Sequence, residues 1–205
     1  MYLVKSPRLL KWYYPSLTWN KSRNKKVIYL TFDDGPIPDV TEFVLKTLKT
    51  FNAKATFFCI GQNISKHPDI FQQLKNDGHS IGNHTFNHLR GWDTVDNLYL
   101  ENFLQCQEQT DSDLFRPPYG RIKKSQIKAI RKLYPEIRII MWDVLSGDFD
   151  LNLSPETCYN NVLKNTTNGS IVVFHDSLKA LDRMQYALPK VLEYFSKEGY
   201  SFEKL

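Results

Sequence analysis

The sequence predicts an α/β fold, a parallel barrel of about seven βα units. Short apolar runs alternate with helix-like segments after residue 26, and successive runs begin roughly 25–30 residues apart, about the size of one βα unit. Polar, chemically reactive residues follow many of these runs. The carboxyl ends of all strands meet at one face of a barrel, whereas the outer strands of an open sheet lie too far apart to share one site. This pattern therefore favours a barrel over a doubly wound sheet.

Strands are expected where β-branched and aromatic residues form short runs. These runs are 27–32, 55–60, 79–82, 113–116, 137–144 and 170–175, with a further candidate at 200–204. Apolar residues recur at helical spacing in 40–51 and 181–195, and Pro189 is expected to kink the second helix. Ser154, which precedes a proline, is typical of a helix N-cap. A further helix is expected over 121–134.

Length and composition are those of one globular domain. The 205 residues are 41% hydrophobic and 24% charged, which allows a sizeable core, and no segment has the apolar length that spans a bilayer. The first residues lack the apolar stretch and cleavage site of a signal peptide, which favours a cytoplasmic or membrane-peripheral location. Cys59, Cys106 and Cys158 form no Cys-x-x-Cys pair, so neither a disulfide framework nor a zinc ribbon is predicted. Cys59 is expected to be a buried core thiol.

The net charge of +5 is unevenly distributed along the chain. Residues 1–26 carry seven Lys and Arg residues and no acid, so this segment is +7 and the rest of the chain is −2. The rest therefore has no basic surplus for nucleic acid. We divide the chain into a basic, aromatic N-terminal arm, residues 1–26, and a barrel domain, residues 27–205. The favoured interpretation packs the arm's aromatic side chains on the barrel with its lysines in solvent, and the alternative is peripheral contact with an anionic membrane.

Two adjacent carboxylates follow the first apolar run, in the segment Thr31-Phe32-Asp33-Asp34-Gly35-Pro36. Neighbouring carboxylates repel each other and are costly in a half-buried position unless one of them is neutralised. A metal ion would hold one carboxylate ionised and leave the other free to move protons. A simple turn is the alternative, because Asp-Asp-Gly-Pro also suits a loop.

His84 and His88 lie four residues apart in His-Thr-Phe-Asn-His, and they are expected on one face of a helical turn, where they could chelate one ion. Two surface histidines would be an ordinary alternative, and His79 is a further histidine nearby. Joined to Asp34, the pair forms an Asp-His-His set that leaves a position open for water, as in catalytic zinc sites. Such a site lowers the pKa of water toward about 7.

Two more patterns suit a catalytic centre. In Arg116-Pro117-Pro118-Tyr119-Gly120 the double proline fixes the backbone and leaves the Tyr119 N–H as the first free donor, which suits an oxyanion site or, alternatively, a surface turn. Asp143 and Asp148 follow the fifth run, and His175 ends the sixth. His175 is either a core imidazole bonded to the backbone or a general acid whose pKa a nearby carboxylate raises.

The order of these motifs resembles the polysaccharide deacetylase family, carbohydrate esterase family four, over nearly all of residues 27–204. Family members show Thr-Phe-Asp-Asp-Gly-Pro, His-Ser/Thr-x-x-His, an Arg-Pro-Pro-Tyr-type motif, Asp-Trp and Leu-x-His. The counterparts in this chain are 31–36, 84–88, 116–119, 148–149 and 173–175. Phe149 stands in place of Trp and Val173 in place of Leu, and these apolar replacements bear on substrate fit more than on chemistry. The resemblance implies a distorted parallel (β/α) barrel.

The resemblance also implies N-deacetylation of an N-acetylated sugar, with acetate released and a free amine left on the sugar. It implies a divalent metal ion, zinc being expected although such sites also accept cobalt. The residues implied as its ligands are Asp34, His84 and His88.

The same resemblance gives roles to the residues around the metal ligands. Asp33 would take a proton from the attacking water, and the Tyr119 N–H would stabilise the developing oxyanion. His175 would protonate the leaving nitrogen. Arg116 would tether Asp33, and Asp148 would keep His175 charged.

Several alternatives stay open at the level of sequence. The substrate could be peptidoglycan, a chitin-like oligosaccharide or a lipid-linked sugar; the missing export signal argues against a wall polymer, and the arm favours a substrate at a membrane. The same site could cleave an O-acetyl ester. A catalytically silent glycan-binding protein is less favoured, because the base, the ligands and the acid are all present. A membrane-surface or interaction protein built around the arm is a third class. Asp143 is a second, less favoured partner for His175.

Overall fold

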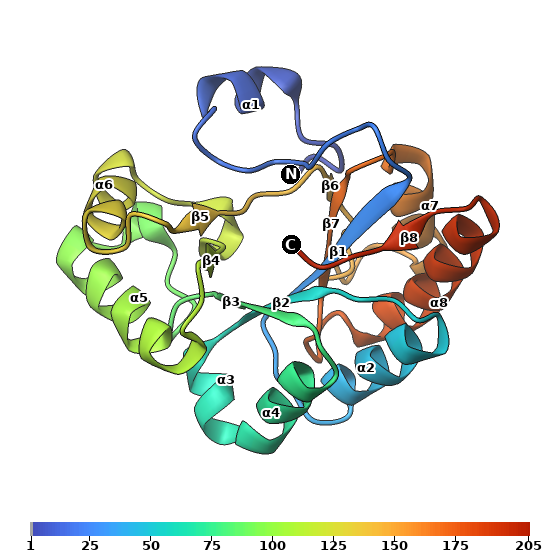
Figure 1. Cartoon of the computed structure of the whole chain (residues 1–205), viewed down its shortest axis with the longest axis horizontal. Coiled ribbons are helices and arrows are strands. Elements are labelled where there is room, and N and C mark those ends of the chain that lie inside the picture. Colours follow the sequence, from blue (N-terminus) through green and yellow to red (C-terminus); the bar gives the residue numbers. More distant parts are fainter. Residues whose placement is uncertain (1) are drawn as a thin grey trace.

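The computed structural model describes residues 2–205 and shows a parallel sheet that curls into an incomplete barrel with helices around its outside (Figure 1). The sheet order is β5-β4-β3-β2-β1-β7-β6, and β8 pairs with the beginning of β1. The predicted distorted (β/α) barrel is confirmed. The strands are β1 Val27–Asp33, β2 Thr56–Cys59, β3 Ser80–Asn83, β4 Leu114–Phe115, β5 Arg138–Ile139, β6 Val144–Leu145, β7 Ile171–His175 and β8 Ser201–Phe202.

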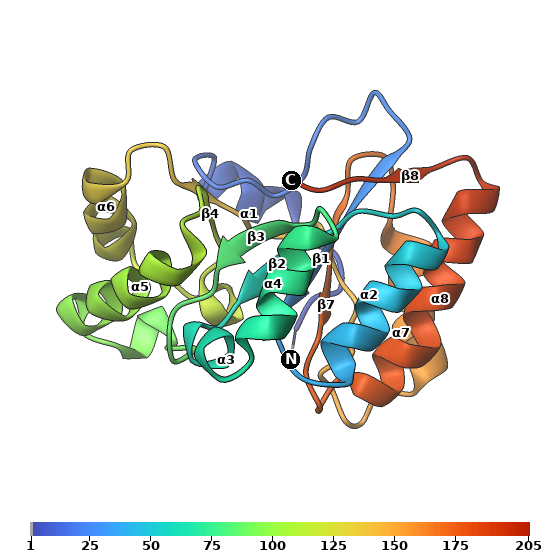
Figure 2. The same ribbon diagram turned by 60° about the horizontal axis from the view of Figure 1, so that its bottom comes forward.

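The helices cover the outer surface of the sheet, with α2, α7 and α8 side by side on one flank (Figure 2). The Ser154 side chain accepts a hydrogen bond from the Thr157 N–H at 3.1 Å, which confirms the predicted N-cap of α7. Helix α8 runs through Pro189 as a single element. The helices are α1 Arg8–Tyr13, α2 Val40–Thr50, α3 Gly61–Lys66, α4 Pro68–Asn76, α5 Asp96–Thr110, α6 Lys124–Leu133, α7 Pro155–Asn165 and α8 Leu181–Lys197, with short 3₁₀ turns η1 Gly91–Asp93 and η2 Pro118–Gly120. No helix within residues 2–205 is long and apolar enough to cross a membrane.

Strand β1 lies at the centre of the sheet, and its register aligns the strand ends. Asp33 is opposite Phe58 of β2 on one side and His175 of β7 on the other. Because parallel strands all end at the same face, this register brings a carboxylate and an imidazole from distant parts of the chain to neighbouring positions.

The expected single strand over 137–144 is wrong. The chain forms two short strands instead, β5 and β6, which do not pair with each other in the sheet. The N-terminal arm fills the opening between them, since Lys5 bridges Val144 antiparallel and Thr18 bridges Ile140 in parallel. The physical reason lies in the middle of the run, where Asp143 is completely buried and a carboxylate needs charged partners that a plain apolar strand would not supply.

The arm supplies those partners. Asp143 accepts hydrogen bonds from Lys5 at 2.8 Å, Lys11 at 2.6 Å and Arg23 at 2.9 Å, and from the Ser170 hydroxyl at 2.7 Å. Burial opposes the charge of this carboxylate, but these donors hold the pKa of Asp143 well below its usual range. The prediction that the lysines of the arm stay in solvent is therefore wrong for Lys5 and Lys11.

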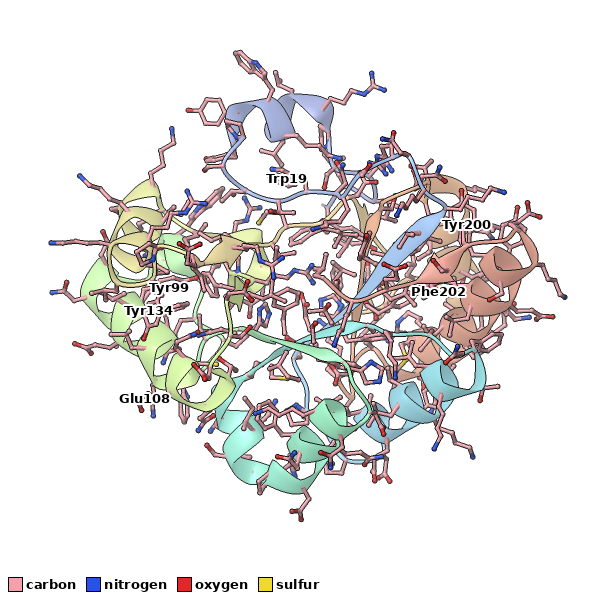
Figure 3. All side chains as sticks on the ribbon, viewed as in Figure 1. Trp19, Tyr99, Glu108, Tyr134, Tyr200 and Phe202 are labelled. Atoms are coloured by element: carbon pink, nitrogen blue, oxygen red, sulfur yellow. The ribbon has the colours of Figure 1, made fainter. Side chains whose placement is uncertain are left out.

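The apolar side chains of the arm divide into two groups. Trp19, beneath α1 in Figure 3, is buried in the same apolar cluster as Tyr99. Trp12, Tyr13 and the neighbouring leucines of α1 are exposed instead, so the packing prediction holds for only part of the arm. The three cysteines are buried and free, as expected for Cys59.

Candidate active site

The residues singled out in the sequence lie at or just beyond the carboxyl ends of the strands, at one end of the barrel. Asp33 and His175 are the last residues of β1 and β7, and the others follow β1, β3, β4 and β6. A barrel gathers such positions at one face. The structure places there Asp33, Asp34, His84, His88, Arg116, Tyr119, Asp148 and His175.

Asp34, His84 and His88 converge on one point. The Asp34 Oδ1 atom lies 3.3 Å from His88 Nε2 and 3.8 Å from His84 Nε2, and one ligand atom from each residue lies within 4.8 Å of the others. The same Asp34 oxygen is buried and has no hydrogen-bond partner within residues 2–205. A buried oxygen without a donor is costly, and a cation shared with two imidazoles would satisfy it. The donor set therefore fits a divalent metal ion.

The two imidazoles are held in the form that binds metals. His84 Nδ1 lies 2.7 Å from the backbone oxygen of Arg116. A carbonyl oxygen only accepts, so Nδ1 carries the proton and Nε2 turns its lone pair toward Asp34. Burial, together with the neighbouring His88, lowers the pKa of His84 well below its ordinary value, and burial lowers the pKa of His88 as well. Neutral imidazoles are the ligand form.

The expectation that His84 and His88 share a helical turn is wrong. They lie in a loop after β3, in which Thr85 has φ 62° and His88 has φ 58°. Left-handed residues cannot continue an α-helix, so the loop itself brings the rings together, with centroids 5.0 Å apart. Asn83 stabilises the turn, because its Oδ1 accepts from the Thr85 N–H at 2.8 Å. Sequence reasoning did not identify this role.

Asp34 also sits on an unusual backbone, with φ 87°. Its carbonyl oxygen accepts from the Asn63 side chain at 2.7 Å, which holds that conformation. The next residue must be Gly35, because a Cβ there would lie only 1.9 Å from an oxygen of Asp176. The strained turn aims the Asp34 carboxylate at the histidines.

Asp33 is fixed by a fully buried arginine. Arg116 Nη1 lies 2.6 Å from Asp33 Oδ1 and 2.7 Å from the Thr31 hydroxyl, and Nη2 donates to the Met141 carbonyl at 3.1 Å. The guanidinium also stacks on Phe58 at 4.1 Å from the ring centroid. Because the arginine is held on several sides, it fixes one oxygen of Asp33 and leaves the other for a reacting group.

His175 is paired with Asp148, whose carboxylate accepts from both the ring and the backbone. Nδ1 lies 2.7 Å from Oδ1, and the His175 backbone N–H donates to Oδ2 at 2.7 Å. Burial disfavours the charged imidazole, but Asp148 outweighs it and raises the pKa of His175 to about 9. The ring also packs edge-on against Phe149. Asp143, the second partner considered for His175, is bound to the arm instead.

Tyr119 occupies the turn after the double proline. Its φ of 59° is left-handed, and its N–H makes no hydrogen bond to another group of the described chain. Tyr119 is 60% exposed, and its ring lies 4.6 Å, centroid to centroid, from the His88 ring. A free N–H on a fixed turn beside a metal ligand can serve as an oxyanion donor.

Asp176 is a further buried acid at the site, to which sequence reasoning gave no role. It accepts from the Thr41 hydroxyl at 2.6 Å and from the Gly35 N–H at 3.0 Å. Burial raises its pKa to about 8. Its position directly after His175 was the sequence feature from which a role at the site could have been inferred. These contacts show that it supports the turn around Asp34.

Fold and site together define a barrel protein with a hydrolase-like centre at the carboxyl ends of the strands. It combines an Asp-His-His donor set that fits a metal ion, a carboxylate fixed by an arginine, and an imidazole whose pKa is raised. The polysaccharide deacetylase family model matches residues 20–135. The chain belongs to the polysaccharide deacetylase family.

The chain is similar to several known proteins. It is 35% identical over 191 residues to a peptidoglycan-N-acetylglucosamine deacetylase of Bacillus cereus, covering 91% of this chain and 89% of the relative. It is 35% identical over 163 residues to a chitooligosaccharide deacetylase of Azorhizobium caulinodans, covering 76% of each. The crystal structure of a peptidoglycan N-acetylglucosamine deacetylase in complex with 4-naphthalen-1-yl-N-oxidanyl-benzamide matches with a TM-score of 0.88 and 31% identity, covering 98% of this chain and 95% of the other.

Proposed function

We propose that this protein is a metal-dependent deacetylase that removes N-acetyl groups from an N-acetylated glycan. The observation that carries the proposal is the arrangement of three groups at one end of the barrel. An unsatisfied Asp34 oxygen faces two neutral imidazoles, an arginine fixes Asp33, and His175 carries a proton. Relatives named as deacetylases of peptidoglycan and chitooligosaccharides support this substrate class.

Asp34, His84 and His88 would hold the ion, for which zinc is expected. When bound, a divalent ion there supplies Lewis acidity that activates water and polarises the acetyl carbonyl. Neither histidine has to lose a proton before it binds the ion, because burial keeps both imidazoles neutral.

Asp33 takes the proton of the attacking water. Arg116 prevents this carboxylate from rotating, so its free oxygen keeps one direction. The Tyr119 N–H donates to the oxygen that becomes negative, a contribution commonly worth about 3–4 kcal/mol for one donor.

His175 gives its proton to the departing nitrogen, which would otherwise leave as an unstable amide anion. With its pKa raised to about 9, the imidazole is protonated at neutral pH and ready to act as an acid. Asp148 compensates the positive charge and fixes the ring through Nδ1. The C–N bond breaks as this proton arrives, which yields acetate and the free amine.

The first test is acetate release from chitin oligosaccharides of several lengths, with chelated protein before and after addition of zinc. Release that depends on zinc would support the proposal and rank substrates by length. An O-acetylated sugar run in parallel distinguishes an esterase. Tight zinc binding without release from any acetylated glycan would favour a glycan-binding protein, and the absence of both binding and release would refute the metal site.

A further inference from the structure

Two loops run side by side away from the metal site. At their first contact the Tyr119 ring lies 4.6 Å from the His88 ring. At the next contact the Gly91 N–H donates to the Arg121 carbonyl at 3.0 Å. Beyond it, the loops border an open hollow of about 510 Å³. Its lining residues are Val95, Asp96, Asn97 and Lys123. A glycan bound at the metal site could therefore continue along this pair of loops.

Arg121 is stacked on Trp92 within this pair of loops. The guanidinium carbon lies 4.1 Å from the centroid of the indole ring. The ring is oriented by a hydrogen bond from its N–H to the Ile122 carbonyl at 3.1 Å, and Trp92 as a residue is 47% exposed. Stacking fixes the plane of the guanidinium and leaves its N–H groups free to point outward.

Arg121 is a half-buried residue, and its guanidinium has no anionic partner within residues 2–205. Apart from the exposed Arg8, every other arginine of the chain pairs with a carboxylate or donates to an oxygen. Nearby Lys123 is already occupied by Asp96 at 3.7 Å and by the Thr94 carbonyl at 2.8 Å. The partnered arginines are Arg23, Arg90, Arg116, Arg131, Arg138 and Arg183.

We propose that Arg121, held flat on Trp92, binds an anionic substituent of the glycan, a carboxylate or a phosphate, next to the sugar that loses its acetyl group. This inference rests on the proposed function and specifies its substrate. Arg121 follows Tyr119 by two residues, so their Cα atoms are at most about 7 Å apart. The fork of guanidinium donors matches the two oxygens of a carboxylate or phosphate.

The test compares Arg121→Gln with wild type on matched glycans. These are chitotetraose, which is neutral, a peptidoglycan tetrasaccharide with free lactyl carboxylates, its methyl ester, and a chitobiose 1-phosphate. We expect wild type to have a higher kcat/KM on an anionic glycan than on its neutral counterpart. Arg121→Gln should lose about tenfold or more in kcat/KM on the anionic glycan alone, mainly because KM rises. Arg121→Lys should recover part of the loss. Arg138→Gln is the control, because it removes the same charge from an exposed pair with Asp113.

Binding measured separately keeps the inference independent of turnover. Titration calorimetry of the same glycans into an Asp33→Asn protein gives affinities without hydrolysis. The inference is supported if this protein binds the carboxylate glycan more tightly than its methyl ester, or the phosphate glycan more tightly than chitotetraose, and if that preference disappears in the double variant with Arg121→Gln. The preferred glycan then identifies the anion. Equal affinities for neutral and anionic glycans overturn it, even if the enzyme deacetylates them all. If the wild-type protein releases no acetate from any of these glycans but the anion preference is still measured, the proposed function is refuted and the anion site remains supported.

Discussion

Four carboxylates, three at the active site and one beneath the arm, have four different sets of partners, and the partners decide what each can do. Asp33 faces one buried guanidinium, and Asp34 faces two imidazoles. Asp148 faces the charged His175, and Asp143 faces three cations of the arm. The side chain is the same in all four, so these contacts are what suit each carboxylate to its proposed role as base, metal ligand, orienting group or structural anchor.

Asp33→Asn separates the base from the metal site. The amide keeps the size of the side chain and one acceptor for Arg116 but cannot take a proton. We expect bound zinc to stay near one equivalent while kcat falls by about 10²–10⁴-fold. His84→Ala is the matched comparison and should lose both zinc and activity. Full activity of Asp33→Asn would remove this residue as the base.

His175→Ala tests the acid through the leaving group. An amide nitrogen needs a proton to depart, whereas the phenolate of an aryl acetate leaves without one. The variant should therefore lose far more activity on an N-acetylated oligosaccharide than on an aryl acetate. Parallel losses on the two substrates would show that His175 does something other than protonate the leaving group.

The pKa of His175 also predicts a pH-dependent stability in the chelated protein. Its folded pKa of about 9 lies above the ordinary value of 6.5, so the stabilisation is complete below about pH 6.5 and is lost as pH rises through 9. The difference in unfolding free energy between wild type and His175→Gln should shrink over this range, by at most about 3.4 kcal/mol. Urea titrations measure it. His79→Gln is the control, because burial lowers the pKa of His79 to about 4 and keeps it neutral throughout. A constant difference would contradict the assignment.

Helices and strands were predicted correctly where short-range sequence patterns determine them. The apolar runs gave β1 and β7 nearly to the residue, and Ser154 gave the start of α7. The loop at His84 was misread as helical because spacing says nothing about left-handed backbone, which Asn83 stabilises by a contact of its own.

The break between β5 and β6 could not be predicted from the sequence either, but for a different reason than the loop at His84. It depends on pairing across most of the chain, since Lys5 and Asp143 are 138 positions apart. An isolated Asp in an apolar run looks like an active-site candidate, and its buried partners become visible only in three dimensions. The convergence of Asp34, His84 and His88 could be predicted because all three follow strands, whose carboxyl ends meet at one face of a barrel.

Asp143→Ala should show how strongly the arm is anchored. Removing this carboxylate leaves Lys5, Lys11 and Arg23 without their shared partner. Because these side chains are 20–38% exposed and can be hydrated, the loss should be about 1.5–3 kcal/mol. Chemical denaturation measures the loss. Asp113→Ala is the control, because its pair with Arg138 is exposed and should contribute less than about 1 kcal/mol. Equally small losses in both variants would mean that the arm is not held through Asp143.

At the scale of the whole molecule, two ends of the chain complete a barrel that its strands leave open. The arm covers the gap between β5 and β6, and the C-terminal residue closes the opposite end from the active site. There the Leu205 N–H donates to the Thr56 hydroxyl at 3.0 Å, and its side chain packs on the interior apolar cluster. Removing residues 1–26 would therefore uncover Asp143 and the barrel wall, so deletion is unsuited to testing any separate function of the arm.

Point substitutions in α1 can test membrane contact without disturbing that anchor. Leu9 and Trp12 are 73% and 77% exposed, and Tyr13 beside them lies under Lys124 at 4.8 Å. Figure 1 shows α1 outside the edge of the sheet. Exposed aromatic and basic side chains together suit an anionic lipid surface.

We therefore expect the protein to sediment with vesicles containing phosphatidylserine but not with purely phosphatidylcholine vesicles. Leu9→Ser combined with Trp12→Ser should lower the bound fraction severalfold, because the apolar side chains that enter the interface are gone while Lys5, Lys11 and Arg23 keep Asp143 neutralised. Leu178→Ser is the matched control, since this leucine is 72% exposed but lies far along the chain, before α8. Equal binding by both variants, or no binding of wild type to anionic vesicles, would leave α1 as a purely structural part of the arm. Acetate release measured on the same samples separates loss of membrane contact from loss of the active fold.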